Sequence, residues 1–259
     1  IHSNVAKLSF GLECAPTKSA MAAINKSHLR IVAKSVVFGI AYGRGAKAIA
    51  MAAKEQGINI SIDDAQRIIN TIFNTYPGLE PFFAKCQDRA NRKRCDGGGN
   101  YEGWLVNCFG RYRRFPPVPE NDRGLQGEFG RQAMNFPIQS MIASVVSRAM
   151  GYLYDIRSDV GGSDLFKVIL QIHDAVLLEV PYKHVKLVAE EIIPFAMRDC
   201  VPVYPTDLDG KATTKEPYYL GIEADMMSHW GEAIPDEKAQ ELGLPTGTFV
   251  KDGMVMNYT

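Results

Sequence analysis

The amino-acid sequence predicts an α+β protein, in which helices alone come first and helices combined with an antiparallel sheet come later. The first 95 residues show helical patterns separated by the chain breakers Pro16, Gly57 and Pro77. Residues 125–157 carry the pattern of one long helix, and residues 167–181 that of two apolar strands joined by a tight turn. These patterns place the two kinds of structure in separate parts of the chain.

Five helical segments are expected in the first part. They cover residues 3–26 (with a break at Pro16), 28–43, 44–56, 61–76 and 79–95. Ser61 stands where a helix N-cap is needed, because its hydroxyl can accept a bond from a backbone N–H of the first turn. Pro77 and Gly78 end that helix. The last segment finishes in basic residues, which suit the negative end of a helix dipole.

Turns, strands and two more helices complete the predicted fold. Residues 96–100 form a glycine-rich turn, and residues 104–115 a short hairpin. The proline run over 116–119 is the best candidate boundary, so we expect one domain over 1–115 and another over 116–259. The second domain is expected to hold a helix over 125–157, the hairpin over 167–181, a helix over 182–199 and a strand over 218–225, followed by a tail over 232–259.

Composition narrows the class of protein. The chain has 259 residues, of which 46% are apolar, as is typical of a folded core. Lys plus Arg and Asp plus Glu number 29 each, so net charge alone does not indicate nucleic acid. Basic residues nevertheless outnumber acidic ones eight to three between Lys85 and Arg114. The five dispersed cysteines and the lack of a long apolar run predict reduced thiols, a cytoplasmic location and no membrane partner.

The most informative pattern lies in residues 28–43, where four residues spaced four apart form one helical stripe about 18 Å long. They are Arg30, Lys34, Phe38 and Tyr42. Two cations suit a polyphosphate and two flat rings suit a nucleobase, and a nucleoside triphosphate has both parts. The plainer alternative is a solvated basic face beside core aromatics. A glycine follows each aromatic, although glycine inside a helix costs about 1 kcal/mol relative to alanine. Glycine at these positions would let another surface, such as a base pair, approach the backbone closely.

The spacing Arg-x3-Lys-x3-Phe-Gly-x2-Tyr-Gly resembles the fingers helix of family A DNA polymerases, the bacterial DNA polymerase I type. Three later segments resemble the same family in the same order. These are Phe109-Gly-Arg-Tyr-Arg-Arg114, Arg131-x3-Asn135-x-Pro137-x-Gln139 and Gln171-Ile-His-Asp174. The resemblance implies a right-hand polymerase, with 1–115 as the helical fingers subdomain. Residues 116–259 would form the C-terminal part of the palm, with an antiparallel sheet, flanking helices and a C-terminal tail.

The resemblance implies a nucleotide-binding set on and beside the stripe. Arg30 and Lys34 would bind the triphosphate of a dNTP, and Lys34 would be a catalytic residue that protonates or neutralises the leaving pyrophosphate. Phe38 would pack against the incoming sugar and base, and the family associates phenylalanine here with rejection of dideoxynucleotides. Tyr42 would occupy the template-base position while the fingers are open. His2 resembles the family histidine that contacts the β-phosphate.

The resemblance also implies contacts to primer–template DNA. Arg131, Asn135 and Gln139 share one helix face, where polar side chains can read the minor-groove acceptors that every base pair presents. The alternative is an exposed polar face without a DNA contact. Against this alternative, the interleaved Met134, Phe136 and Ile138 are expected to be core residues. Pro137 is expected to interrupt the helix. His173 would contact the primer terminus. The basic turn would hold template or primer phosphates through Arg111, Arg113 and Arg114.

Asp174 is the expected metal ligand and catalytic carboxylate. Apolar flanks are expected to bury the strands on either side of it and hold the turn rigidly. Polymerases of this type hold two Mg²⁺ ions with two carboxylates. The family's other aspartate lies in an Asp-Tyr-Ser-like motif that these 259 residues do not contain, and Ala175 stands where the family usually has Glu. We therefore expect a split active site, in which a second polypeptide or a missing segment carries that aspartate and the thumb. A split gene or a cleavage would each explain a chain that begins at Ile1.

The predicted function is therefore template-directed DNA synthesis, by nucleotidyl transfer from a dNTP to the primer 3′-hydroxyl with a two-metal mechanism. Two alternatives stay open. A single-subunit RNA polymerase has a similar Arg, Lys and Tyr-Gly, although Phe38-Gly39 argues against it. A non-catalytic DNA-binding or assembly subunit is favoured by Ala175 and by the missing first aspartate.

Overall fold

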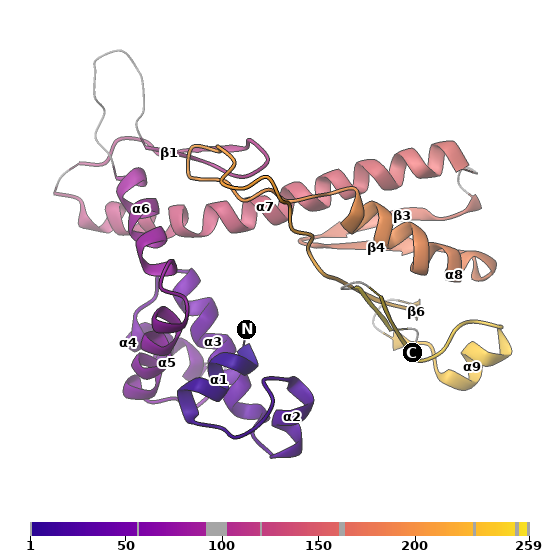
Figure 1. Cartoon of the computed structure of the whole chain (residues 1–259), viewed down its shortest axis with the longest axis horizontal. Coiled ribbons are helices and arrows are strands. Elements are labelled where there is room, and N and C mark those ends of the chain that lie inside the picture. The colour runs from indigo at the N-terminus through magenta and orange to yellow at the C-terminus, as the bar shows by residue number, and fades with distance from the viewer. Residues whose placement is uncertain are drawn as a thin grey trace, which may run out of the picture. The chain divides into compact units, whose positions relative to one another are not determined.

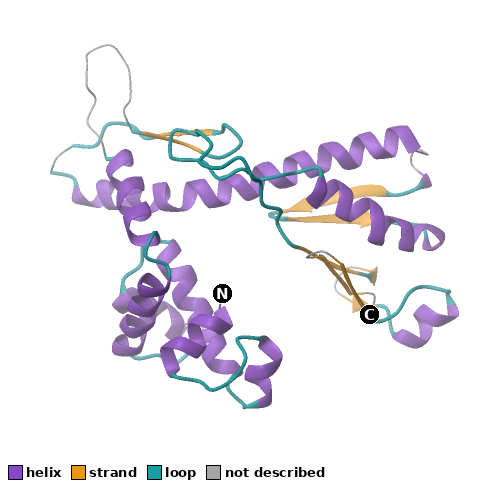
Figure 2. Cartoon of the chain, in the orientation of Figure 1, coloured by secondary structure: helices purple, strands orange, loops and turns teal. Residues whose placement is uncertain are grey.

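The structure is a computed structural model. It describes residues 2–55, 57–91, 103–119, 121–160, 164–229, 232–251 and 254–257. Ile1, the end of the expected helix over 79–95 and the expected turn over 96–100 lie outside the described residues. Helices and short antiparallel hairpins occur together in the chain, which confirms the predicted α+β class (Figure 2).

The chain divides into two compact units. One comprises Ile1–Leu105 with Tyr112–Pro137, and the other Val106–Arg111 with Ile138–Thr259. This partition is interleaved, because the turn over 106–111 belongs with the later residues and residues 112–137 with the earlier ones. The expected boundary at 115/116 instead divides the chain once along the sequence. The assignment of residues 1–115 to the fingers and 116–259 to the palm stays a prediction.

The first unit is helical in its part before residue 91. Its helices in chain order are α1 (His2–Phe10), α2 (Lys18–Ala23), α3 (Ser27–Ala41), α4 (Ala46–Glu55), α5 (Ile62–Thr75) and α6 (Leu79–Ala90). Helices α1, α3, α4 and α5 pack around one apolar core, to which Val5, Val36 and Ile68 belong (Figure 1). The Ser61 hydroxyl accepts a bond from the Asp64 N–H at 3.0 Å, so the expected N-cap is confirmed.

The expected continuation of helix over 44–56 is wrong at its start, because α3 ends at Ala41 and α4 begins at Ala46. Gly43 adopts a φ of +65°, and its N–H donates to the Ile40 carbonyl. The Arg44 N–H donates to the Gly39 carbonyl at 2.9 Å. These two bonds form the Schellman arrangement that ends many helices at a glycine. Gly43 is therefore a helix stop rather than a helix-interior glycine.

Gly39 lies where α3 and α4 meet. A Cβ built on it would lie 2.5 Å from Ile49 Cγ1 and 2.8 Å from Ile49 Cδ1. A close approach to this glycine is therefore present, and the approaching group is Ile49 of the protein's own α4.

We expect Gly39→Ala to lower the free energy of unfolding by about 1–3 kcal/mol, because the added methyl overpacks the α3–α4 contact. Denaturant unfolding measures the change. Gly45→Ala is the matched control, since a Cβ at Gly45 meets nothing within 4 Å. The double change Gly39→Ala with Ile49→Ala should cost less than the sum of its parts. Equal costs for Gly39→Ala and Gly45→Ala would contradict this packing.

A small hairpin and a long helix follow. Strands β1 (Trp104–Val106) and β2 (Tyr112–Arg114) pair, and α7 spans Arg123–Val160. The expected hairpin over 104–115 is confirmed. The expected interruption at Pro137 is wrong, because α7 continues through this residue. An interior proline destabilises a helix by about 3 kcal/mol. Burial of residues on both sides of Pro137, among them Met134 and Val145, offsets this cost.

The second unit contains a hairpin that packs against helices. Strands β3 (Lys167–Ile172) and β4 (Ala175–Glu179) pair antiparallel, with Ile172 opposite Ala175. They lie beside the end of α7 and the helical segment after residue 182 (Figure 1), around a core that includes Leu153, Phe166 and Val188. The expectation that both strands are buried is wrong, because every residue of β3 and β4 is exposed or only partly buried. Ile169 and Leu170 are 51% and 48% exposed. The pairing of β3 with β4 is irregular at this point, with a register shift between Val168 and Leu170.

The segment expected as one helix over 182–199 is irregular. It comprises η2 (Tyr182–His184), α8 (Val185–Leu187) and two π-helical stretches, η3 (Val188–Ile192) and η4 (Phe195–Asp199). The expected strand over 218–225 is shorter, because β5 covers Ile222–Asp225 while Tyr218 forms an isolated bridge with Val203. The rest contains β6 (Met227–His229), β7 (Glu232–Ala233), α9 (Asp236–Glu241), β8 (Thr248–Lys251) and β9 (Met254–Asn257). Strand β9 lies between β5 and β8.

Candidate functional site

Helix α3 divides into a buried and an exposed face. Val32, Val36 and Ile40 are buried in the core of the first unit. On the other side Phe38 is 49% exposed and Tyr42 is 45% exposed. The aromatics of the stripe are therefore not core residues, which removes the plainer alternative for them. Large apolar rings left half open to solvent beside a cation are the surface that a flat ligand can cover.

Helix α1 brings His2 to this exposed face. The His2 and Phe38 ring centroids lie 5.8 Å apart, and Lys34 Nζ lies 5.8 Å from the centre of the Phe38 ring. Burial lowers the pKa of His2 below its usual value, and the positive charges of Arg30 and Lys34 lower it further. The buried Nδ1 of His2 has no hydrogen-bond partner among the described residues. The structure thus brings together four of the predicted nucleotide-binding residues.

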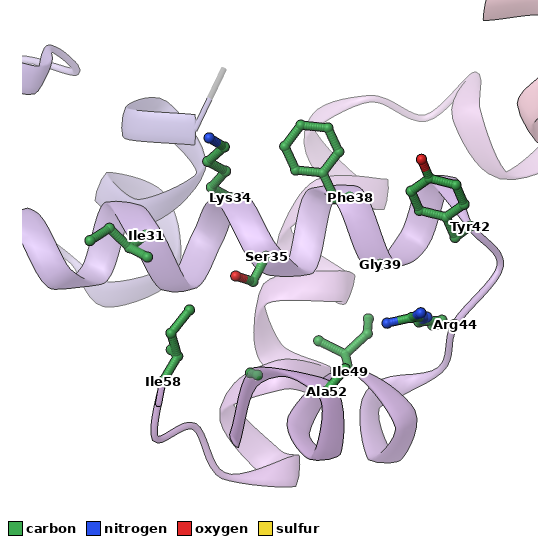
Figure 3. A pocket seen from close by; sticks show the side chains of 11 residues that line it. Ile31, Lys34, Ser35, Phe38, Gly39, Tyr42, Arg44, Ile49, Ala52 and Ile58 are labelled. Carbon is green, nitrogen blue, oxygen red and sulfur yellow. The ribbon is translucent and has the colours of Figure 1, made fainter. Parts of the chain in front are cut away.

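A cavity of about 440 Å³ opens between α3 and α4 (Figure 3). Lys34, Phe38 and Tyr42 line it together with Ile31, Ser35, Gly39, Arg44, Ile49, Ala52, Ala53 and Ile58. Its walls combine polar and apolar side chains, and its cations, Lys34 and Arg44, come from α3 and from the turn after it. Arg44 was missed by the sequence reasoning, because residue 44 was expected inside a continuing helix. The signal that reveals it is Gly43, whose positive φ turns the chain back toward α4.

The end of α3 also touches a predicted DNA-binding residue. A Cβ on Gly43 would lie 2.8 Å from Arg131 Cγ, so the aliphatic stem of Arg131 packs on this glycine. Arg131 and Gln139 are exposed on α7, and Asn135 is partly buried. The Asn135 side-chain amide donates to the Arg131 carbonyl at 3.3 Å. The expected core position of Ile138 is wrong, since it is 54% exposed and belongs to the same open stretch of α7.

The three arginines of the basic turn differ in their surroundings. Arg111 and Arg114 are exposed. Arg113 donates to the Gln132 side-chain oxygen, and its guanidinium lies 5.6 Å from the centre of the Phe115 ring. Arg113 is thus held by protein groups on β2 and α7. Among the three, Arg111 and Arg114 are better placed for phosphates.

Asp174 lies at the exposed tip of the β3–β4 hairpin, as predicted. His173 beside it has a φ of +52°, a left-handed conformation that is uncommon for a residue other than glycine. The Gln171 side-chain amide donates to the His173 carbonyl at 3.2 Å and steadies the turn. Within the described ranges, no group of three or more His, Cys, Asp or Glu side chains is arranged to hold a metal ion. Asp174 therefore offers a single carboxylate of the oxygen type that Mg²⁺ prefers.

Among the described residues, no helix is both long and apolar enough to cross a lipid bilayer.

Comparison with known proteins gives consistent matches. The family model of DNA polymerase family A matches residues 1–208. A DNA polymerase of Escherichia phage T5 is 32% identical over 192 residues, which are 68% of this chain and 20% of the relative. DNA polymerase I of Caldicellulosiruptor bescii is 31% identical over 201 residues, which are 78% of this chain and 21% of the relative. The chain thus spans about a fifth of the length of these relatives.

A solved structure is also similar to this chain. It is the POL domain of Pol1 from M. smegmatis in complex with DNA primer-template and dNTP. The match has a TM-score of 0.59 at 26% identity and covers 78% of this chain and 31% of that chain.

Proposed function

The chain belongs to DNA polymerase family A, and we propose that it supplies the nucleotide-binding helix, DNA contacts and one metal-binding carboxylate of a template-directed DNA polymerase. The observation that carries this proposal is the exposed face of α3, where Lys34, Phe38 and Tyr42 line one cavity beside His2. A polymerase needs such a face, because it must hold a triphosphate and a flat base at once.

In this proposal the incoming dNTP lies along α3. Arg30 and Lys34 bind the triphosphate, and His2 adds a hydrogen-bonding imidazole next to them. Phe38 packs against sugar and base, and Tyr42 covers the template-base position before closure. Because the family match is to DNA polymerases, the proposal is for deoxyribonucleotides, and the RNA-polymerase alternative is set aside.

Primer–template DNA is proposed to contact both units. Arg131, Asn135 and Gln139 follow minor-groove acceptors from the exposed stretch of α7. Arg111 and Arg114, with Arg113 behind them, contact phosphates, and His173 contacts the primer terminus. Backbone contacts of this kind position DNA without reading its sequence, as a polymerase requires.

Asp174 is proposed to hold divalent metal together with a carboxylate from outside these 259 residues. Its exposed position on a paired hairpin fits this role, because Mg²⁺ is commonly bound by one or two carboxylates and substrate phosphates. A divalent metal held there would supply Lewis-acid activation of the primer 3′-hydroxyl and charge stabilisation for the leaving pyrophosphate. The second carboxylate and the thumb come from another part of the polymerase, either a further segment of the same protein or a second polypeptide.

Equilibrium binding tests the proposal. The chain is titrated against fluorescent primer–template DNA, alone and with the dNTP that matches the template base. We expect the matched dNTP to tighten the DNA complex more than a mismatched dNTP or the matching ribonucleotide. Failure to bind primer–template DNA at low salt would contradict the proposed function.

Phe38→Tyr is expected to raise incorporation of dideoxynucleotides relative to dNTPs. A phenolic hydroxyl at this position can supply a hydrogen bond where the 3′-hydroxyl is missing. Such a bond is worth about 1 kcal/mol, so the ratio of dideoxynucleotide to dNTP incorporation should rise about fivefold or more. Competition between the two substrates in primer extension by the assembled polymerase measures it. Phe82→Tyr on α6 adds the same hydroxyl elsewhere and should leave the ratio unchanged. An unchanged ratio in Phe38→Tyr would count against the placement of Phe38 at the sugar.

A further inference from the structure

Asn107 is a buried polar residue that the site described above does not use. It follows β1 and is 2% exposed. Its side chain lies between two parts of the second unit, the basic turn and helix α7. The polar groups of a buried side-chain amide are normally hydrogen-bonded in a folded protein. The partners of Asn107 indicate what it does.

All four bonding positions of the Asn107 side chain are filled. Its Oδ1 accepts from the backbone N–H groups of Phe109 and Arg111, both at 2.9 Å. Its Nδ2 donates to Ser140 Oγ at 3.0 Å and to Ser144 Oγ at 3.2 Å. An amide has one oxygen with two lone pairs and one nitrogen with two hydrogens, so none is left over. The two backbone donors also fix which end of the amide faces the turn.

The backbone of the turn closes around the same residue. The Asn107 N–H donates to the Arg111 carbonyl at 3.0 Å, and the Gly110 N–H donates to the Asn107 carbonyl at 2.9 Å. Gly110 has a φ of +78°, which a side chain would strain. Residues 107–111 are therefore held as one rigid loop whose exposed side chain is that of Arg111.

Helix α7 supplies the other side of the clamp. Ser140 and Ser144 are one helical turn apart and face the same way, and Ser144 Oγ in turn donates to the Ser140 carbonyl at 2.8 Å. The Arg148 guanidinium, one further turn along, lies 4.5 Å from the centre of the Phe109 ring. Phe109 also packs against the apolar cluster that contains Val145 and Ala149. The loop is thus fixed to a single face of α7.

We propose that Asn107 is a positioning residue for DNA binding: it clamps the loop over 107–111 onto α7 and so holds Arg111 in place for a DNA phosphate. This inference rests on the proposed function, because it takes Arg111 to be a phosphate contact. Asn107 itself touches no DNA. Its effect on DNA is exerted through the backbone of Arg111.

Two measurements on the same variants test this role. Hydrogen exchange at the Phe109 and Arg111 amides reports whether the loop is held. Primer–template affinity, measured over a range of salt concentrations, reports the number of phosphate contacts, and losing one contact lowers the slope of log K against log salt by about 1. A residue that only stabilised the fold would not change this slope.

We expect Arg111→Ala to lower the slope by about 1 while the Phe109 amide stays protected. Asn107→Ala should speed exchange at both amides and lower the slope to the same extent. Combining the two substitutions should lower it no further. Asn107→Asp keeps the acceptors for both amides and should retain their protection and most of the affinity. The paired change Ser140→Ala with Ser144→Ala leaves Asn107 in place and should weaken the clamp in the same direction.

Ser147→Ala is the matched control, because Ser147 Oγ also donates to a carbonyl four residues earlier on α7, at 2.8 Å. It should change neither readout. An unchanged slope in Asn107→Ala, with a lowered slope in Arg111→Ala, would overturn the inference and leave the proposed function intact. An unchanged slope in Arg111→Ala would also overturn the inference, because it would show that Arg111 does not contact a phosphate. No binding of primer–template DNA by the wild-type chain would contradict the proposed function as well.

Discussion

Lys34→Ala is expected to slow single-nucleotide incorporation by about 10²–10⁴-fold in the assembled polymerase, the range that a positioned proton donor contributes. The exposed ammonium of Lys34 stands beside Phe38 at the edge of the cavity between α3 and α4. A triphosphate bound along α3 would place its leaving group near this cation. Pre-steady-state incorporation with Mg²⁺ and a matched dNTP measures the rate.

Two further variants sharpen that result. Lys34→Arg keeps the positive charge, but a guanidinium does not release its proton near neutral pH. Recovery of the rate in Lys34→Arg would assign charge neutralisation to Lys34, whereas continued loss would assign proton donation. Lys47→Ala on α4 removes an exposed lysine that does not line the cavity and should leave the rate unchanged. Equal rates for Lys34→Ala and the wild type would contradict the placement of the triphosphate on α3.

Asp174→Asn is expected to reduce Mg²⁺-dependent extension by about 10³-fold or more, since losing a metal ligand costs several kcal/mol of transition-state stabilisation and each 1.4 kcal/mol is tenfold. The substitution preserves the shape of the hairpin tip and removes its negative charge. Affinity for primer–template DNA without metal should stay within a few-fold of the wild type, because the amide replaces no DNA contact.

Asp159→Asn is the control for Asp174→Asn. Asp159 is exposed near the end of α7 and should tolerate the same change without loss of extension. Comparable activity of Asp174→Asn and Asp159→Asn would show that the hairpin carboxylate is not a metal ligand. Loss of DNA affinity in Asp174→Asn would instead indicate a damaged hairpin.

Local signals in the sequence were sufficient for much of the fold. Ser61 caps α5 because a hydroxyl before a helix bonds the first free N–H groups, whatever the rest of the chain does. The apolar runs on either side of His173-Asp174 predicted a hairpin with these two residues at its tip, and the structure confirms it. The stripe on α3 was likewise predictable, since helical spacing alone places Lys34 and Phe38 on one face.

Features that depend on residues distant in the sequence could not be predicted. The space beside Gly39 is filled by Ile49 of the next helix. The end of α3 at Ala41 is different, because it depends on the nearby Gly43, a local signal that the sequence-based prediction of a continuing helix overlooked. Helix α7 continues through Pro137 because tertiary packing outweighs the local signal. Asn107 offered no motif at all, since its four partners come from a turn and from a helix more than thirty residues away. The roles assigned to the site residues stay predictions.

Primer extension with Mg²⁺ tests the central claim most directly. The chain is assayed alone and then with any chain that co-purifies with it, identified by mass spectrometry. We predict extension when the added polypeptide carries an Asp-Tyr-Ser-like motif, little or none from these 259 residues by themselves, and loss of the restored activity in Asp174→Asn. Full activity from these residues alone would contradict the shared metal site. No extension with such a polypeptide present, despite DNA binding, would contradict the claim of a polymerase active site and favour a non-catalytic DNA-binding subunit.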